Sequence, residues 1–180
     1  MRKVVLTYGI LAGVIIVALM VISFSLVSAS SEGSSTSMVI GYATMIVSLS
    51  MIFFGIRNYR DNYSGGSVTF GRGFLIGLYI SIIASVFYVV GWKIYSSIAM
   101  PDFADKYAAQ MVNTLKKSGA TDAAILAKTK EMAEWKAWYG NPFIELAMTF
   151  LEIFPVGLII SAICALILKR KPKTGAVGSR

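Results

Sequence analysis

Glu152 has the strongest potential for chemistry in this sequence, because its carboxyl group lies inside a long apolar stretch. Counting from Phe143 at 1.5 Å per residue predicts a depth of about 13 Å, near the middle of a bilayer. An ionised carboxyl group there costs about 2.5 kcal/mol or more, so we expect Glu152 to be neutral and hydrogen-bonded to hydroxyl groups. Pro155, in the next turn, removes a backbone donor and can kink the helix. The candidate hydroxyl groups at this depth are those of Ser23, Ser48, Ser85 and Tyr88.

A charged pair is predicted closer to the edge of the membrane. Lys93 ends one apolar segment, and Glu145 falls in the first turn of another at a matching depth. A charge withdrawn from water without a partner is strongly destabilising. We therefore expect Lys93 to pair with Glu145, which leaves Glu152 without a cation at its own level.

The composition excludes most familiar catalytic and metal-binding chemistry. The 180 residues include no His and one Cys, which rules out imidazole catalysis, zinc sites built from Cys and His, and an internal disulfide. Gly71-Arg72-Gly73 lacks the further glycine of a dinucleotide fingerprint and the lysine of a phosphate-binding loop. Arg60 and Asp61 are better explained as an ion pair. We expect no enzyme activity, no cofactor and no metal.

Four uncharged apolar runs predict four transmembrane helices, since crossing a bilayer takes roughly 20 apolar residues. The chain is 56% hydrophobic and 14% charged, with a mean hydropathy of +0.69. The predicted spans are residues 4–28, 38–56, 73–95 and 143–168 of a single membrane domain, residues 1–171, and a disordered cytoplasmic tail follows at 172–180. Arg2 and Lys3, just before residues 4–28, form the basic start of a secretory signal. Their apolar core exceeds the roughly 7 to 15 residues of a signal peptide, which favours a retained anchor.

The distribution of basic residues predicts that both termini face the cytoplasm. Lys and Arg gather at the N-terminus, in the loop at residues 57–72 and in the C-terminal tail, whereas the other two connections show no such excess. The net charge of +8 is then explained by this pattern and by attraction to anionic lipid head groups. A nucleic-acid partner is not expected.

The loop at residues 57–72 is the densest polar segment of the chain. Arg57, Arg60 and Arg72, with Asp61 among them, are candidates to bind lipid phosphates or a partner protein. The alternative interpretation is purely structural: a short interfacial helix, a glycine turn and a return into the membrane.

Residues 101–140 predict a small extracytoplasmic hairpin of two helices between the third and fourth spans. Asp102 is placed to cap the first helix and Thr121 the second, while Gly119 suits a left-handed helix end. Apolar residues recur at helical spacing in both segments. We expect the two helices to pack on each other and on the membrane surface.

Small residues spaced four apart predict close contacts between helices. They share one face of a helix, and missing side chains let two backbones approach where apolar burial offers no advantage over lipid. Packing within the bundle and a homodimer seam both fit the pattern. The residues are Gly9 and Gly13 in the first span, Gly73, Gly77, Ser81 and Ser85 in the third, and Gly157 and Ser161 in the fourth.

Two classes of function follow from these features. The favoured one is a structural, scaffold or assembly partner in the membrane, because four spans lack the length for the repeats usual in secondary transporters. The alternative is a small proton- or cation-coupled transporter that uses Glu152, with Pro155 letting the last span move. Expected partners are anionic membrane lipid at the cytoplasmic face, a second copy of the chain or another membrane protein.

Two runs of sequence are distinctive: Tyr59-Arg60-Asp61-Asn62 and residues 150–157, which include Glu152. Together with further matching residues, they resemble a bacterial family of four-span membrane proteins, the domain of unknown function 4199. These further residues are 41–45, 48–56, 65–66, 69–71, 88–89, 92, 94–95 and 102–103. The resemblance covers nearly the whole chain up to residue 171. It implies an all-α protein of the bacterial inner (cytoplasmic) membrane with four helices, and it implies no activity.

Overall fold

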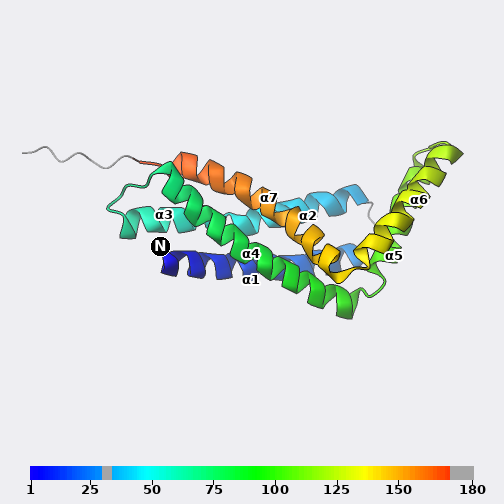
Figure 1. Cartoon of the computed structure of the whole chain (residues 1–180), viewed down its shortest axis with the longest axis horizontal. Helices are drawn as coiled ribbons and strands as arrows, with labels where there is room; N and C mark the ends of the chain where they lie inside the picture. Colours follow the sequence, from blue (N-terminus) through cyan, green and yellow to red (C-terminus); the bar gives the residue numbers. More distant parts are fainter. Residues whose placement is uncertain (30–33, 171–180) are drawn as a thin grey trace, which may run out of the picture.

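The protein consists of helices joined by short connections. The computed structural model describes residues 1–29 and 34–170, and within these ranges it contains no strand beyond one isolated pairing of Val68 with Arg170. The predicted tail at 172–180 and part of the first connection lie outside the described residues. The helices are α1 (Arg2–Ala29), α2 (Ser34–Leu49), α3 (Met51–Tyr63), α4 (Phe70–Ala99), α5 (Phe103–Lys117), α6 (Asp122–Tyr139) and α7 (Pro142–Leu168) (Figure 1).

Four helical segments are long and apolar enough to cross a membrane. They cover Arg2–Ser25, Val39–Tyr63, Phe70–Ala99 and Pro142–Leu168. A helix satisfies its own backbone hydrogen bonds, which a segment in the hydrocarbon layer must do. Apolar side chains on every face then suit contact with lipid. The predicted all-α fold is confirmed, with four helices that are long and apolar enough to span a membrane.

The second segment combines α2 and α3, which meet at Ser50. The Ser50 amide donates to the Ile46 carbonyl oxygen at 3.0 Å, so the chain stays nearly helical through the junction. α3 then continues to Tyr63, beyond the predicted end of the span at residue 56. Arg57 and Asp61, one turn apart, approach to 3.6 Å and favour this extra helix. The predicted loop at 57–72 is therefore wrong in extent, because only residues 64–69 connect α3 to α4.

The connection between α3 and α4 turns on two glycines. Gly65 and Gly66 have φ values of +59° and +78°, where a side chain would be strained. Thr69 then caps α4 by accepting a hydrogen bond from the Arg72 amide at 3.4 Å. The glycine turn of the structural interpretation is present, but its interfacial helix is the end of α3.

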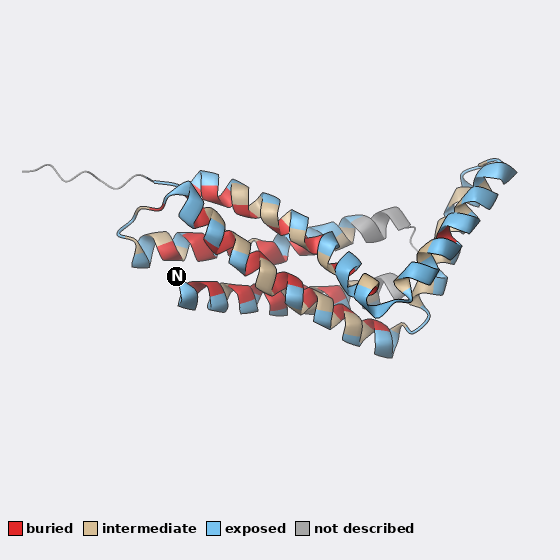
Figure 2. Cartoon of the chain, viewed as in Figure 1, coloured by how far each residue is buried: buried red, intermediate tan, exposed pale blue. Residues whose placement is uncertain are grey.

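α4 is the central helix of the bundle. It packs along both α7 and α1 and also contacts α3. Buried residues follow the inward faces of the long helices, and exposed residues follow the outward faces (Figure 2). The fully buried apolar side chains include Ile16, Ile52, Ile80 and Ile153, one from each spanning segment.

α5 and α6 pack together and extend from one end of the bundle (Figure 1). We call residues 103–139 the projection, its end of the bundle the projection end, and the opposite end, which carries the N-terminus, the basic end. Met132 is the buried residue of these two helices. Figure 2 shows that the rest of the projection is exposed or half-buried.

Two of the three helix-end residues predicted in the projection, Thr121 and Gly119, are confirmed, and the third, Asp102, is wrong. Thr121 accepts from the Ala124 amide at 3.4 Å, and Gly119 has a φ of +75°. Asp102 precedes α5 but makes no capping hydrogen bond. Its carboxylate instead pairs with Lys106 at 3.0 Å, and this hydrogen bond lowers the pKa of Asp102.

Candidate functional site

A ridge of small residues lets α4 and α7 pack closely. A Cβ atom added to Gly77 would lie 2.7 Å from Ser161 Oγ, and one added to Gly157 would lie 2.7 Å from Ser81 Oγ. Gly73 faces α7 in the same way, one turn closer to the basic end. Carbon atoms in contact are about 3.5–4.0 Å apart, so larger residues do not fit here. The small residues predicted in the third and fourth spans therefore face each other within one chain.

Gly9 and Gly13 belong to a second contact, between α1 and α4. Added Cβ atoms would lie 2.9 Å from Ile83 and 2.5 Å from Phe87. Large side chains of α4 thus fill the space over the glycines of α1. Packing within the bundle accounts for both groups of small residues, which favours this interpretation over the homodimer seam.

Serine hydroxyl groups line the contact between α4 and α7. Ser81 donates to the Gly77 carbonyl oxygen at 2.9 Å, Ser161 donates to the Gly157 carbonyl oxygen at 2.7 Å, and the two hydroxyl oxygens lie 3.2 Å apart. Ser85 is fully buried, and its hydroxyl has no partner among the described residues. Such an unpaired group costs about 1–3 kcal/mol. The middle of α4 therefore contains unused hydrogen-bonding capacity.

Glu152 lies beside Tyr88 of α4. Tyr88 is 8% exposed, whereas the Glu152 side chain is exposed at the margin of the buried face of α7. The other three candidates, Ser23, Ser48 and Ser85, make no hydrogen bond to Glu152 among the described residues, so Tyr88 is the candidate that the structure places next to it. Ser48 and Ser85 are fully buried. The Ser48 hydroxyl donates instead to the Thr44 carbonyl oxygen at 2.8 Å.

Pro155 lies inside α7 without ending the helix. The proline has no amide to donate to the Leu151 carbonyl oxygen, so one helical hydrogen bond is missing next to Glu152. Pro155 is exposed, and the gap in the hydrogen-bond pattern therefore lies on the outer side of α7.

The predicted pair of Lys93 and Glu145 is present at the projection end. Lys93 Nζ lies 2.5 Å from Glu145 Oε2, and the Glu145 side chain is 8% exposed against 43% for Lys93. One turn further along α7, the Thr149 hydroxyl donates to the Glu145 carbonyl oxygen at 2.8 Å. The ion pair joins α4 to α7 at the end where the small-residue ridge stops.

An aromatic cluster fixes the projection to the bundle. Trp92 Nε1 of α4 donates to the hydroxyl of Tyr139, the last residue of α6, at 2.8 Å. Phe103 of α5 packs edge-on against Trp92 with ring centroids 4.7 Å apart, and Tyr107 packs against Trp135 further out. Burial raises the pKa of Tyr139 to about 12, although the Trp92 hydrogen bond acts in the opposite direction. The Tyr139 hydroxyl therefore stays protonated at neutral pH.

The arginines predicted to recognise a partner lie at the basic end. Arg60 donates to Asp61 through Nε at 2.6 Å and Nη2 at 3.1 Å, and Arg57 approaches the same carboxylate at 3.6 Å. The predicted ion pair of Arg60 and Asp61 is confirmed. Arg72 is exposed in the first turn of α4 and has no ion pair among the described residues.

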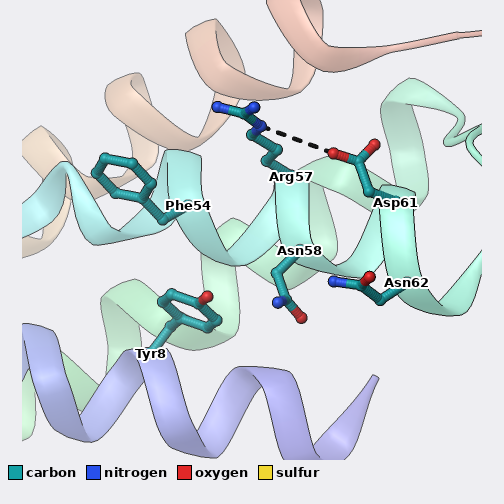
Figure 3. Close-up of a pocket in the computed structure, with 6 residues that line it drawn as sticks. All are labelled: Tyr8, Phe54, Arg57, Asn58, Asp61 and Asn62. Atoms are coloured by element: carbon teal, nitrogen blue, oxygen red, sulfur yellow. Dashed lines mark ion pairs between the residues drawn. The ribbon is translucent and has the colours of Figure 1, made fainter.

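A pocket at the basic end includes residues that the sequence analysis missed. Asn58 and Asn62 of α3 point toward α1, and Tyr8 of α1 points back toward them (Figure 3). Spacing of four residues places the two asparagines on one helix face, and this was the available signal. The pocket is lined by Tyr8, Phe54, Arg57, Asn58, Asp61 and Asn62.

The described residues contain no cluster of three or more side chains able to hold a metal ion. A family model described as "Protein of unknown function (DUF4199)" matches residues 7–170, from α1 to the end of α7. No curated protein and no solved structure matches the chain. The matched region covers nearly all of the sequence, and the chain therefore belongs to the DUF4199 family.

Proposed function

We propose that the protein is a scaffold or assembly partner of the bacterial inner membrane, with a structural and not an enzymatic role. The projection would present a docking surface to another membrane protein or to a second copy of the chain. The observation that carries the proposal is the tie between Trp92 and Tyr139, which attaches the projection to the bundle at a hydrogen bond of 2.8 Å. A surface held in a fixed orientation loses less entropy on binding.

The exposed side of α6 suits such contacts. Leu126 is 73% exposed, and all the alanines of α6 are exposed as well. An ion pair of Asp105 with Lys136 joins α5 to α6. α6 therefore offers exposed apolar side chains, interspersed with charged ones such as Lys130 and Glu134, while its contacts with α5 keep it in place.

Co-purification in mild detergent tests the scaffold proposal. The wild-type chain is expected to retain a partner at fixed stoichiometry. Leu126→Glu is expected to reduce the retained partner about tenfold, since a charge placed in an apolar interface costs more than about 1.4 kcal/mol. Gln110→Glu, which adds the same charge on exposed α5, is the matched control and should retain the partner. Full retention by Leu126→Glu, or recovery of the wild type without any partner, contradicts the proposal.

A small proton- or cation-coupled transporter is the second candidate, and the exposure of Glu152 next to Tyr88 favours it. Glu152→Gln in the same co-purification separates the two candidates. Glutamine keeps the size and hydrogen-bonding capacity of the side chain but cannot ionise. A scaffold retains its partner with this variant, whereas a transporter loses proton-coupled uptake in vesicles.

We propose that both termini face the cytoplasm, which places the projection outside. The support is the charge distribution: the basic end carries Arg57, Arg60 and Arg72, and Lys169 and Arg170 follow α7. Ser118 lies exposed at the end of α5, so Ser118→Cys is expected to react with an impermeant thiol reagent in intact cells. Cys164 is buried, and the wild type serves as the unlabelled control. Labelling that appears only after lysis would reverse the orientation.

A further inference from the structure

We propose that the groove between α1 and α3 at the basic end binds the phosphate head group of one anionic phospholipid. The groove encloses about 220 Å³ and is open to one side. It lies at the opposite end of the bundle from the projection, so the inference does not depend on the scaffold proposal.

The floor of the groove consists of uncharged hydrogen-bond donors without partners. The amides of Asn58 and Asn62 point toward α1, and the Tyr8 side chain points toward them (Figure 3). None of these three side chains makes a hydrogen bond within the described part of the chain. Amide and hydroxyl donors that converge from two helices suit phosphate oxygens, which are strong acceptors.

The charge at the rim of the groove favours an anion. Arg60 donates two hydrogen bonds to Asp61 and occupies that carboxylate. Arg57 also lines the groove, although Figure 3 shows its side chain on the side of α3 that is turned away from α1. It approaches Asp61 only to 3.6 Å and is 56% exposed, so most of its donors are free. Outside the groove, Arg2 and Lys3 are two more exposed cations at the basic end, in the first turn of α1, where the helix dipole is also positive. The positive charges at this end of the bundle therefore outnumber the one negative charge in the groove, that of Asp61.

The apolar side of the groove indicates that the phosphate belongs to a lipid. Phe54 lies one turn from Arg57 toward the middle of the second span, and its ring is exposed on the outside of the bundle. An acyl chain that descends from a bound head group would run along this ring, whereas free phosphate would leave it uncovered. The polar rim of the groove would face the lipid head group, and its apolar wall would face the acyl chain, as the two are arranged in a leaflet.

Native mass spectrometry of the full chain tests the site. The chain is purified in mild detergent and mixed with equal amounts of phosphatidylglycerol and phosphatidylcholine. The wild type is expected to retain one phosphatidylglycerol in preference to phosphatidylcholine. Arg57→Gln is expected to weaken that retention about tenfold through loss of charge-assisted hydrogen bonds. Asn58→Leu, which leaves all charges in place, is expected to weaken it several-fold.

The matched control is Arg72→Gln, which removes the same charge at the same end but outside the groove. It should leave retention of phosphatidylglycerol unchanged. Equal losses in the Arg57 and Arg72 variants would reduce the effect to diffuse attraction and overturn the site, as would a wild type that does not distinguish the two lipids. Displacement of the lipid by excess inorganic phosphate would identify a free-anion site and overturn the lipid assignment.

Discussion

Replacing Gly77 with leucine is expected to destabilise the bundle by about 3 kcal/mol or more. A Cβ atom at this position would lie 2.7 Å from Ser161 Oγ and 3.0 Å from Ile52 Cγ2. Both neighbours are fully buried and have no free volume into which to move. Adding single methylene groups to a packed core already costs about 1–3 kcal/mol, and leucine adds four carbon atoms. Thermal unfolding in detergent, followed by circular dichroism, measures the loss.

The matched control is Gly41→Leu on α2, where an added Cβ atom meets nothing within 4 Å. Leucine has the better helix propensity by about 0.8 kcal/mol, so this control should unfold at or slightly above the wild-type temperature. The same experiment decides the role of the small residues. A Gly77→Leu variant that unfolds like the wild type but changes oligomeric state would restore the homodimer seam and refute packing within the chain.

Replacing Lys93 with methionine is expected to cost about 2–3 kcal/mol of stability. The Glu145 side chain is 8% exposed and pairs with Lys93 at 2.5 Å. Removing one partner of a buried pair typically costs about 3–5 kcal/mol because the other charge is left uncompensated. Because Lys93 is 43% exposed, we expect a smaller loss of stability than for a fully buried pair. The double variant Lys93→Met/Glu145→Met should recover most of the loss, since an apolar replacement of both charges is often neutral.

Lys106→Met provides the comparison for an exposed pair. Its partner is Asp102, one turn earlier, and both side chains are more than half exposed. Pairs of this kind contribute about 0.3–0.5 kcal/mol, so little change in unfolding temperature is expected. Equal effects of the Lys93 and Lys106 variants, or a double variant no more stable than Lys93→Met, would show that burial of Glu145 does not govern this contact.

The features that are local in sequence could be predicted without the structure. Four apolar segments, the caps at Thr121 and Gly119, and the ion pair of Arg60 with Asp61 all depend on residues close together along the chain. The pair of Lys93 with Glu145 is distant in sequence, yet it was predicted because charges are scarce near the membrane and depth along a helix follows from residue count. Asp102 was mispredicted because Lys106, one turn away, competes for its carboxylate.

By itself, the sequence determined which segments are helical, which of them are apolar enough to cross a membrane, and which end of the bundle carries the excess of positive charge. Only the tertiary structure decided that Gly77 and Gly157 pack within the chain, that Tyr88, one of four candidate hydroxyls, lies beside Glu152, and that Tyr8 and Asn58 line one groove. The physical reason is that lipid and protein interiors are equally apolar, so hydrophobicity does not select which helix faces pair. That choice depends on the fit of side chains from distant parts of the chain.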